Sequence, residues 1–370
     1  MTSVPSALQA LHDPPLPGRH LVRTAHGARR ASAPGVTVVR VVGRSCRVRR
    51  GRGYRRGRSP VHDRVRATEE DPMAPVLPAL VDPTTLRAAL DAASDRPVVL
   101  DASTSLVTHG EGEPYTAGPL REQYLAAHVP GAAFVDVTGE LSDPAGPYPF
   151  TLPPAEALAA AFGAVGIGDD THVVVYDTVG SAWATRVWWL LRWLGHDRVS
   201  VLDGGLAAWQ AAGFTTASGA ADDEAARLVP GVLTPRERPE LLATLPQVEQ
   251  ISSGAAPGVL VNALDPATFR GDQDVSTYAR RGRIPGSVNL PLFTLLDPAT
   301  GRFLPADELR DRLQAGGLLD ADGAVTYCGG GIAATLPAFA AFVVAGTEVA
   351  VYDGSLSEWT ADERLPVAAG

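Results

Sequence analysis

Residues 324–346 read AVTYCGGGIAATLPAFAAFVVAG, and this stretch decides both the fold class and the chemistry. Residues 324–327 are apolar or β-branched and predict a short buried strand, whereas residues 332–346 predict an apolar helix. Between them stand Cys328 and three glycines. Glycines permit a tight loop whose N–H groups point inward, and the start of a helix adds partial positive charge. The stretch therefore predicts a strand, a thiol and an anion-holding loop in direct succession.

Cys328 has two interpretations on this stretch alone. A cradle of N–H groups stabilises a thiolate, which is the reactive form of cysteine, and holds an anion beside it. A cysteine that follows a buried strand is otherwise a small core hydrophobe. An internal repeat in the chain favours the first interpretation.

The repeat consists of paired motifs that recur 150 to 155 residues apart. Residues 128–134 read HVPGAAF and residues 283–289 read RIPGSVN. Residues 201–209 read VLDGGLAAW and residues 351–359 read VYDGSLSEW. Each unit is long enough to form its own core, so the pattern predicts two similar domains and not a solenoid.

The repeat also pairs Cys328 with an aspartate. The strand 173–176, VVVY, precedes Asp177 as the strand 324–327, AVTY, precedes Cys328. One copy therefore carries a nucleophile and the other carries a carboxylate in its place.

At these residues the chain resembles the two-domain rhodanese family, the thiosulfate and 3-mercaptopyruvate sulfurtransferases. The resemblance extends from about residue 75 to about residue 366. It rests on the paired His/Arg-x-Pro-Gly turns, the paired Asp-Gly…Trp endings, the triplet 269–271 (FRG) and the strand–Cys–loop–helix unit. It implies an inactive first domain and a catalytic second domain, in agreement with Asp177 opposite Cys328.

Apolar strands alternate with helical segments in both copies, as in a mainly parallel sheet that is covered on both faces. We therefore expect an α/β fold of two tandem rhodanese-like domains, each a mainly parallel sheet flanked by helices. The expected bounds are 75–214 for the non-catalytic domain, 215–240 for the linker and 241–368 for the catalytic domain. In such sheets the site lies beyond the carboxyl ends of the strands, where Cys328 stands.

The first 72 residues differ from the rest in charge. They carry 15 arginines and five acidic residues, against 17 basic and 36 acidic residues in the remainder. Three interpretations are open: an arm that binds nucleic acid or an acidic surface, an organelle-targeting segment, or an artefact of an upstream start site. The third is favoured because the family-like sequence begins just after Met73, and we expect the arm to be disordered.

Compartment and disulfide use follow from two further features. No stretch has the apolar core and cleavage site of a secretory signal. The two cysteines lie in unrelated regions, so a structural disulfide is not expected, and a reducing cytoplasm is the predicted location.

The expected chemistry is sulfur transfer through Cys328. Its thiolate would attack the outer sulfur of thiosulfate or 3-mercaptopyruvate, release sulfite or pyruvate, and pass the sulfur to cyanide, a small thiol or a protein thiol. Backbone N–H groups would stabilise the thiolate and the persulfide, and the loop that supplies them comprises Gly329, Gly330, Gly331, Ile332, Ala333 and Ala334. Neither a metal nor another cofactor is expected, and no membrane partner.

The anionic donors require cations. Arg270 in the triplet FRG resembles the family's substrate-binding arginine, and a guanidinium there would grip a carboxylate or sulfonate. Arg281 and Arg283 belong to a second basic cluster, and both are further candidates for binding the substrate. Arg186 lies in the first domain and is a weaker candidate for the cleft between the domains.

The chain departs from the family pattern close to the cysteine. Thiosulfate-type relatives have Arg or Lys one or two residues after it, where this chain has Gly329 and Gly330. Mercaptopyruvate-type relatives have a serine at the position of Gly330, and vertebrate members add an Asp and a His, matched here by Thr138 and Phe150. The donor therefore stays open between the two types.

Two other classes of function compete. A Cys-x5-Arg phosphatase needs an arginine six residues after Cys328, where Ala334 stands, so this class is excluded. A non-catalytic tandem module that binds or carries sulfur for a protein partner stays as the alternative to turnover.

Overall fold

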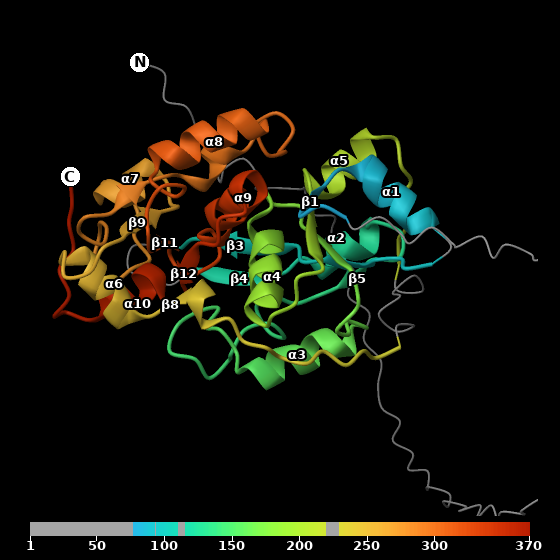
Figure 1. Ribbon diagram of the computed structural model, residues 1–370, viewed down its shortest axis with the longest axis horizontal. Coiled ribbons are helices and arrows are strands. Elements are labelled where there is room, and N and C mark those ends of the chain that lie inside the picture. Colours follow the sequence, from blue (N-terminus) through green and yellow to red (C-terminus); the bar gives the residue numbers. More distant parts are fainter. Residues whose placement is uncertain (1–76, 93, 110–114, 220–228) are drawn as a thin grey trace, which may run out of the picture. The chain divides into compact units, whose positions relative to one another are not determined.

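The computed structural model describes residues 77–92, 94–109, 115–219 and 229–370. The arginine-rich arm and Cys46 lie outside the described residues, so the predictions for that segment stay predictions. The described chain holds two five-stranded sheets and one small hairpin (Figure 1).

The two sheets have the same topology. Every strand pairing within them is parallel. The first sheet has the order β1 (Leu80–Val81), β7 (Val199–Leu202), β6 (Val173–Tyr176), β2 (Val98–Asp101) and β5 (Ala133–Phe134). The second repeats it with β8 (Leu242–Ala243), β12 (Ala350–Tyr352), β11 (Ala324–Tyr327), β9 (Val259–Asn262) and β10 (Val288–Asn289). The sequence repeat is thus a repeat of topology.

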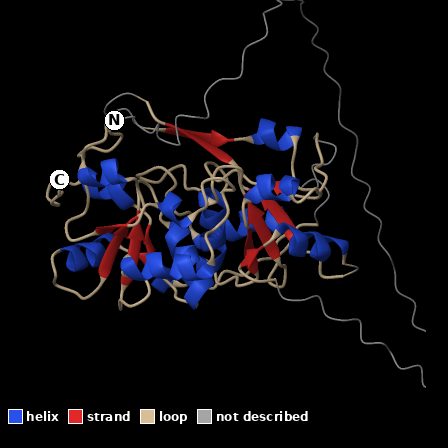
Figure 2. Ribbon diagram, turned by 90° about the horizontal axis from the view of Figure 1, so that it is seen from above, coloured by secondary structure: helices blue, strands red, loops and turns tan. Residues whose placement is uncertain are grey.

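Helices lie on both sides of the strands (Figure 2). Those of the first domain are α1 (Pro83–Asp91), α2 (Arg121–Ala126), α3 (Ala155–Ala164), α4 (Ala182–Trp193) and α5 (Gly205–Ala211). Those of the second are η3 (Pro239–Leu241), α6 (Leu245–Ser252), α7 (Pro266–Arg270), η4 (Leu292–Leu295), α8 (Ala306–Ala315), α9 (Thr335–Ala345) and α10 (Ser355–Ala361). The small antiparallel hairpin pairs β3 (Thr104–Val107) with β4 (Thr116–Pro119).

The two domains share one hydrophobic core, because α4 packs against α9. All twelve residues of α4 are buried. The ring of Trp188 meets that of Phe339 edge-on, with centroids 5.0 Å apart. Between the same helices, the hydroxyls of Thr185 and Thr335 form a hydrogen bond of 2.9 Å. Thr185 and Thr335 are matching positions of the repeat, so the two halves meet at equivalent points.

The sequence-based expectation of an α/β fold with flanked parallel sheets is confirmed. The predicted helix over residues 332–346 is observed as α9, but it begins only at Thr335. Residues 332–334 form turns instead. The edge strands β1, β5, β8 and β10 have two residues each, too few to show a period in the sequence.

Candidate functional site

Cys328 directly follows β11, the central strand of the second sheet. We call residues 328–334 the cysteine loop. Only 2% of Cys328 is exposed. Its backbone N–H donates to the hydroxyl of Ser355 at 3.0 Å, and that hydroxyl lies 4.0 Å from Sγ as a donor. The thiol is therefore held at the carboxyl edge of the sheet, as the predicted parallel sheet implies.

The first turn of α10 fastens the cysteine loop from the other side. The N–H of Leu356 donates to the carbonyl of Cys328 at 3.1 Å. Ser357 donates to the carbonyl of Gly329 through both its N–H (2.9 Å) and its hydroxyl (2.7 Å). These bonds turn the carbonyl groups of Cys328 and Gly329 toward α10, so these two acceptors are bound away from the thiol.

Two phenols crowd the glycines after the thiol. A Cβ placed on Gly329 would lie 2.1 Å from the hydroxyl of Tyr278, and one on Gly330 would lie 2.7 Å from that of Tyr115. Burial, together with the negative charge that Cys328 can carry, raises the pKa of Tyr115, and burial likewise raises that of Tyr278. Both phenols therefore stay protonated and neutral beside the loop, and each hydroxyl can donate a hydrogen bond.

The N–H groups predicted to form the anion cradle have no partner in the structure. Within the described part of the chain, no hydrogen bond is formed by the backbone N–H groups of Gly329, Gly330, Gly331, Ile332, Ala333 and Ala334. Gly331 has φ of +79°, a left-handed conformation that suits glycine. Unpaired buried N–H groups are costly, so the loop is prepared to accept an anion.

The matching loop of the first domain already holds an anion. We call residues 177–183 the aspartate loop. Asp177 is buried, and its carboxylate accepts four backbone hydrogen bonds of 2.8 to 3.0 Å, from Val179, Ser181, Trp183 and Ala184. Burial raises the pKa of Asp177, and these hydrogen bonds oppose the rise. A pocket of 290 Å³ adjoins this loop.

Arg270 does not reach the thiol in this structure. It ends α7, its side chain is 48% exposed, and Nε is 2.8 Å from a carboxylate oxygen of Asp272. Its predicted role would require that the guanidinium leave Asp272 when a donor binds.

The other two predicted arginines bind backbone carbonyl groups. Arg281 is exposed and donates to the carbonyl of Gln273 at 2.6 Å. Arg283 donates to the carbonyl of Gly370 at 2.9 Å and stacks on the ring of Phe269. Arg283 thus braces its own turn. The hydrogen bonds described for Arg281 and Arg283 do not reach the cysteine loop.

Arg186 is the residue of the site that the sequence analysis underrated. It is completely buried in α4, and its guanidinium lies 2.6 Å from the carboxylate of Asp353. The same nitrogen donates to the carbonyl of Gly331 in the cysteine loop at 3.2 Å. The signal in the sequence was an arginine in the middle of a mainly apolar helix, because arginine is rarely buried without a partner.

The two positions matched to the proton relay of vertebrate relatives differ in their surroundings. Thr138 hydrogen bonds to the carboxylate of Asp136. Phe150 lies beside the cysteine loop, stacked on Tyr115 and edge-on to Trp183. A ring carbon of Phe150 is 3.5 Å from a Cβ placed on Gly330. An apolar ring therefore stands beside the glycine.

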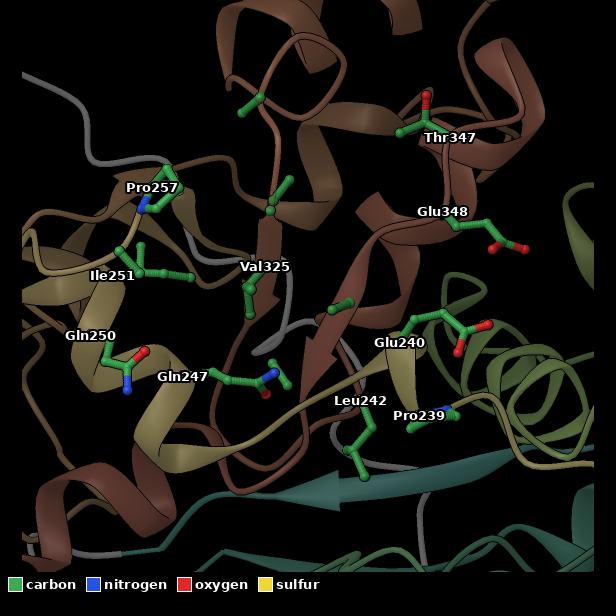
Figure 3. Close-up of a pocket in the computed structure, with 16 residues that line it drawn as sticks. Pro239, Glu240, Leu242, Gln247, Gln250, Ile251, Pro257, Val325, Thr347 and Glu348 are labelled. Atoms are coloured by element: carbon green, nitrogen blue, oxygen red, sulfur yellow. The ribbon is translucent and has the colours of Figure 1, made fainter.

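Other features of the described chain lie apart from the cysteine loop. Figure 3 shows a pocket whose lining includes residues at the amino ends of β11 and β12. Its volume is 340 Å³, and it lies at the edge of the sheet opposite the one where Cys328 follows β11. None of the residues with a predicted role lines it. The described residues contain no group of three or more His, Cys, Asp or Glu side chains arranged to hold a metal. No helix among them is both long and apolar enough to cross a bilayer.

Comparison with known proteins agrees with this fold. The model of the rhodanese-like domain matches residues 85–212 and 259–362. Thiosulfate/3-mercaptopyruvate sulfurtransferase 2 of Arabidopsis thaliana is 33% identical over 287 residues, which cover 73% of this chain and 81% of the relative. Thiosulfate sulfurtransferase of Bos taurus is 36% identical over 244 residues, covering 65% and 79%. The crystal structure of SseA from Escherichia coli, described as a 3-mercaptopyruvate sulfotransferase, is 29% identical with a TM-score of 0.61, covering 75% and 98%.

Two equivalent α/β domains with one thiol at a strand end define a tandem sulfurtransferase. The chain belongs to the rhodanese family, with one rhodanese-like domain in each half. It is a sulfurtransferase enzyme, as the family resemblance of its sequence predicted.

Proposed function

We propose that the enzyme moves a sulfane sulfur from thiosulfate or 3-mercaptopyruvate through a persulfide on Cys328. The thiolate Sγ forms a bond to the outer sulfur of the donor. The bond between that sulfur and the rest of the donor breaks, and its electron pair leaves with sulfite or, after protonation, with pyruvate. Cyanide, a small thiol or a protein thiol then attacks the outer sulfur and restores the Cys328 thiolate.

The observation that carries this proposal is the occupied aspartate loop. A carboxylate oxygen of aspartate stands two bonds from Cβ, and the outer sulfur of a cysteine persulfide stands at the same number of bonds. In the first domain that oxygen accepts backbone N–H groups of the loop. In the second, the free N–H groups of Gly330 and Ile332 match those of Val179 and Ser181. Asp177 thus serves as a built-in template for the persulfide anion.

The donor is limited by the neutral character of the cysteine loop. Among the described residues, the side chains nearest to Gly329 and Gly330 are those of Tyr278, Tyr115 and Phe150, and none of these is a cation. Relatives of this chain are named for both donors. We keep Arg270, Arg281 and Arg283 as the candidate cations for the donor, with Arg270 first because its partner Asp272 is exposed and exchangeable. We place the enzyme in the cytoplasm, where a reducing environment keeps a free thiol available.

The test is the intact mass of the protein after brief exposure to each donor, with excess donor removed. A gain of one sulfur atom, lost on addition of cyanide with release of thiocyanate, is the expected result. The donor that loads faster names the enzyme. Cys328→Ser should take up no sulfur, and Cys328→Ser with undiminished transfer would refute the proposal. Failure of the reduced protein to load from either donor would instead favour the non-catalytic module.

A further inference from the structure

Arg186 connects the first domain to the cysteine loop of the second. Its guanidinium donates to three acceptors: the carboxylate of Asp353 at 2.6 Å, the carbonyl of Gly331 at 3.2 Å and the carbonyl of Phe150 at 2.8 Å. The side chain is 0% exposed and lies over the ring of Trp189, 4.8 Å from its centroid. A fully buried guanidinium with these fixed acceptors holds one geometry.

The contact with Gly331 fixes the direction of one peptide unit. In a trans peptide the C=O of one residue and the N–H of the next point in opposite directions. Because Arg186 draws the carbonyl of Gly331 toward α4, the N–H of Ile332 is turned away from it, into the cysteine loop. In the first domain the matching peptide joins Gly180 and Ser181, and its N–H donates to Asp177 at 2.9 Å. Gly180 and Gly331 have φ of +78° and +79°, so the two loops turn alike here.

The contact is absent from the reciprocal side of the interface. The N–H of Leu152 donates to Asp353 at 2.8 Å, and the N–H of Phe303 donates to Asp203 at 2.9 Å, at matching positions of the repeat. The Ala-Thr pairs at 184–185 and 334–335 align Arg186 with Leu336, an apolar residue. Arg186 therefore has no counterpart at the matching position of the second domain, although Arg302 carries a charge near Asp203 on the reciprocal side.

We propose that Arg186 is a positioning residue of the second domain's active site, which orients the Gly331–Ile332 peptide so that its N–H serves the anion on Cys328. The first domain, which has no thiol at its own loop, thereby supplies a working part of the site. This inference rests on the proposed role of Cys328 as nucleophile, and its test requires no sulfur donor.

The experiment measures the rate of Cys328 alkylation by iodoacetamide across a pH series in the full-length protein. Arg186→Lys keeps a positive charge for Asp353 but loses the fork that reaches Gly331 and Phe150. We expect the midpoint of its pH–rate profile to move upward by about one unit, because loss of a donor to the thiolate favours the protonated thiol. The midpoint is measured in preference to the rate at one pH, because the thiolate of a less acidic thiol is intrinsically more nucleophilic and partly offsets the fall in rate.

Asp203→Asn is the matched control, because it alters the reciprocal hydrogen bond to Phe303 at the same interface. It should leave the midpoint unchanged even if the melting temperature falls. The double variant Arg186→Met with Asp353→Asn removes both charges of this ion pair, and it should show the same upward shift if the lysine variant does not fold. The inference would be overturned if a folded variant of Arg186 had an unchanged midpoint of the pH–rate profile. It would also be overturned if Asp203→Asn shifted that midpoint by the same amount. If the shift occurs but no donor loads sulfur, the positioning role stands and the proposed sulfur transfer fails.

Discussion

The aspartate loop and the cysteine loop follow equivalent central strands of two sheets that have the same strand order, yet their backbone N–H groups are used differently. The aspartate loop carries its own anion, whose two oxygens satisfy four N–H groups. The cysteine loop leaves its N–H groups free and is one residue shorter between the strand and the paired threonines, Thr185 and Thr335. The difference teaches that an anion cradle binds a substrate anion only when the chain does not already fill it.

The entry into the helix differs accordingly. In the first domain the N–H of Thr185 donates to the carbonyl four residues back, at Ser181, as in an α-helix. In the second, the N–H of Thr335 donates only three residues back, to Ile332 at 3.1 Å. The tighter turn delays the start of α9 and keeps residues 332–334 out of the helix, where their N–H groups remain available for an anion.

The largest expected effect comes from converting one loop into the other. Cys328→Asp places a carboxylate before the free N–H groups and should abolish sulfur transfer, a fall of more than about 10⁴-fold, because no sulfur nucleophile remains. Since the carboxylate finds the same type of donors that Asp177 has, the melting temperature should not fall by more than about 3 °C. Thiocyanate release and thermal unfolding measure the two quantities. A melting temperature far below that of Cys328→Ser would show that the two cradles are not equivalent.

Removal of the carboxylate tests the aspartate loop. Asp177→Ala leaves four buried N–H groups without their acceptor and should lower the free energy of unfolding by about 3 kcal/mol, with water from the adjoining pocket limiting the loss. Urea unfolding provides the measurement. Asp136→Ala is the control, because Asp136 accepts from Thr138 and Gly139 in a more exposed turn and should cost about 1 kcal/mol or less. Equal costs at the two positions would contradict the template argument.

The sequence predicted the strand–thiol–loop unit because that information is local. Residues 324–327 are uniformly apolar or β-branched, and three glycines in a row permit a tight turn. The repeat then supplied the second domain and the pairing of Asp177 with Cys328. Contacts between residues far apart in the sequence were harder to predict, because no local pattern near Cys328 indicates that Arg186 or Tyr115 lies beside the cysteine loop.

Charge alone was a poor guide to the site. Arg270 was predicted from its motif, but in the structure it is paired with Asp272 at the surface. Arg186 was ranked low because it stands in the other domain, although it is the arginine that touches the cysteine loop. The exposure of a side chain depends on how α4 packs against α9, which a one-dimensional pattern does not contain.

The glycines offer a third comparison, since Thr178 and Val179 carry side chains at the positions of Gly329 and Gly330. Gly329→Ala should lower the rate of sulfur transfer about 100-fold, because its Cβ would lie 2.1 Å from the hydroxyl and 2.9 Å from Cζ of Tyr278. Gly330→Ala should cost about tenfold, since only the hydroxyl of Tyr115 is closer than 3 Å.

A double-mutant cycle checks the cause of these losses. Adding Tyr115→Phe to Gly330→Ala removes the crowded hydroxyl and should restore most of the lost rate. Tyr278→Phe should restore only part of the loss in Gly329→Ala, because the ring itself remains too close. If Tyr115→Phe alone lowers the rate as much as Gly330→Ala does, the phenol has a role in the reaction beyond occupying space.

The smallest expected effect concerns pH and again separates the two domains. His172 precedes β6 and is buried, with Nε2 2.9 Å from the hydroxyl of Ser200, whereas the matching position in the second domain is Gly323. Burial lowers the pKa of His172 to about 4. Because the unfolded chain binds a proton at a higher pH than the folded one, stability is complete above about pH 6.5 and falls as the pH drops toward 4.

Urea unfolding at pH 7.5 and pH 5 measures this difference, for which we expect a contribution of about 1–2 kcal/mol from His172. His172→Gln keeps a hydrogen-bonding side chain for Ser200 but does not titrate, so the loss of stability at pH 5 should shrink by that amount. It should not vanish, because burial also lowers the pKa of His196 in the same domain. An undiminished pH dependence in His172→Gln would show that the acid sensitivity resides elsewhere, and the assignment of this sensitivity to the first domain would then fail.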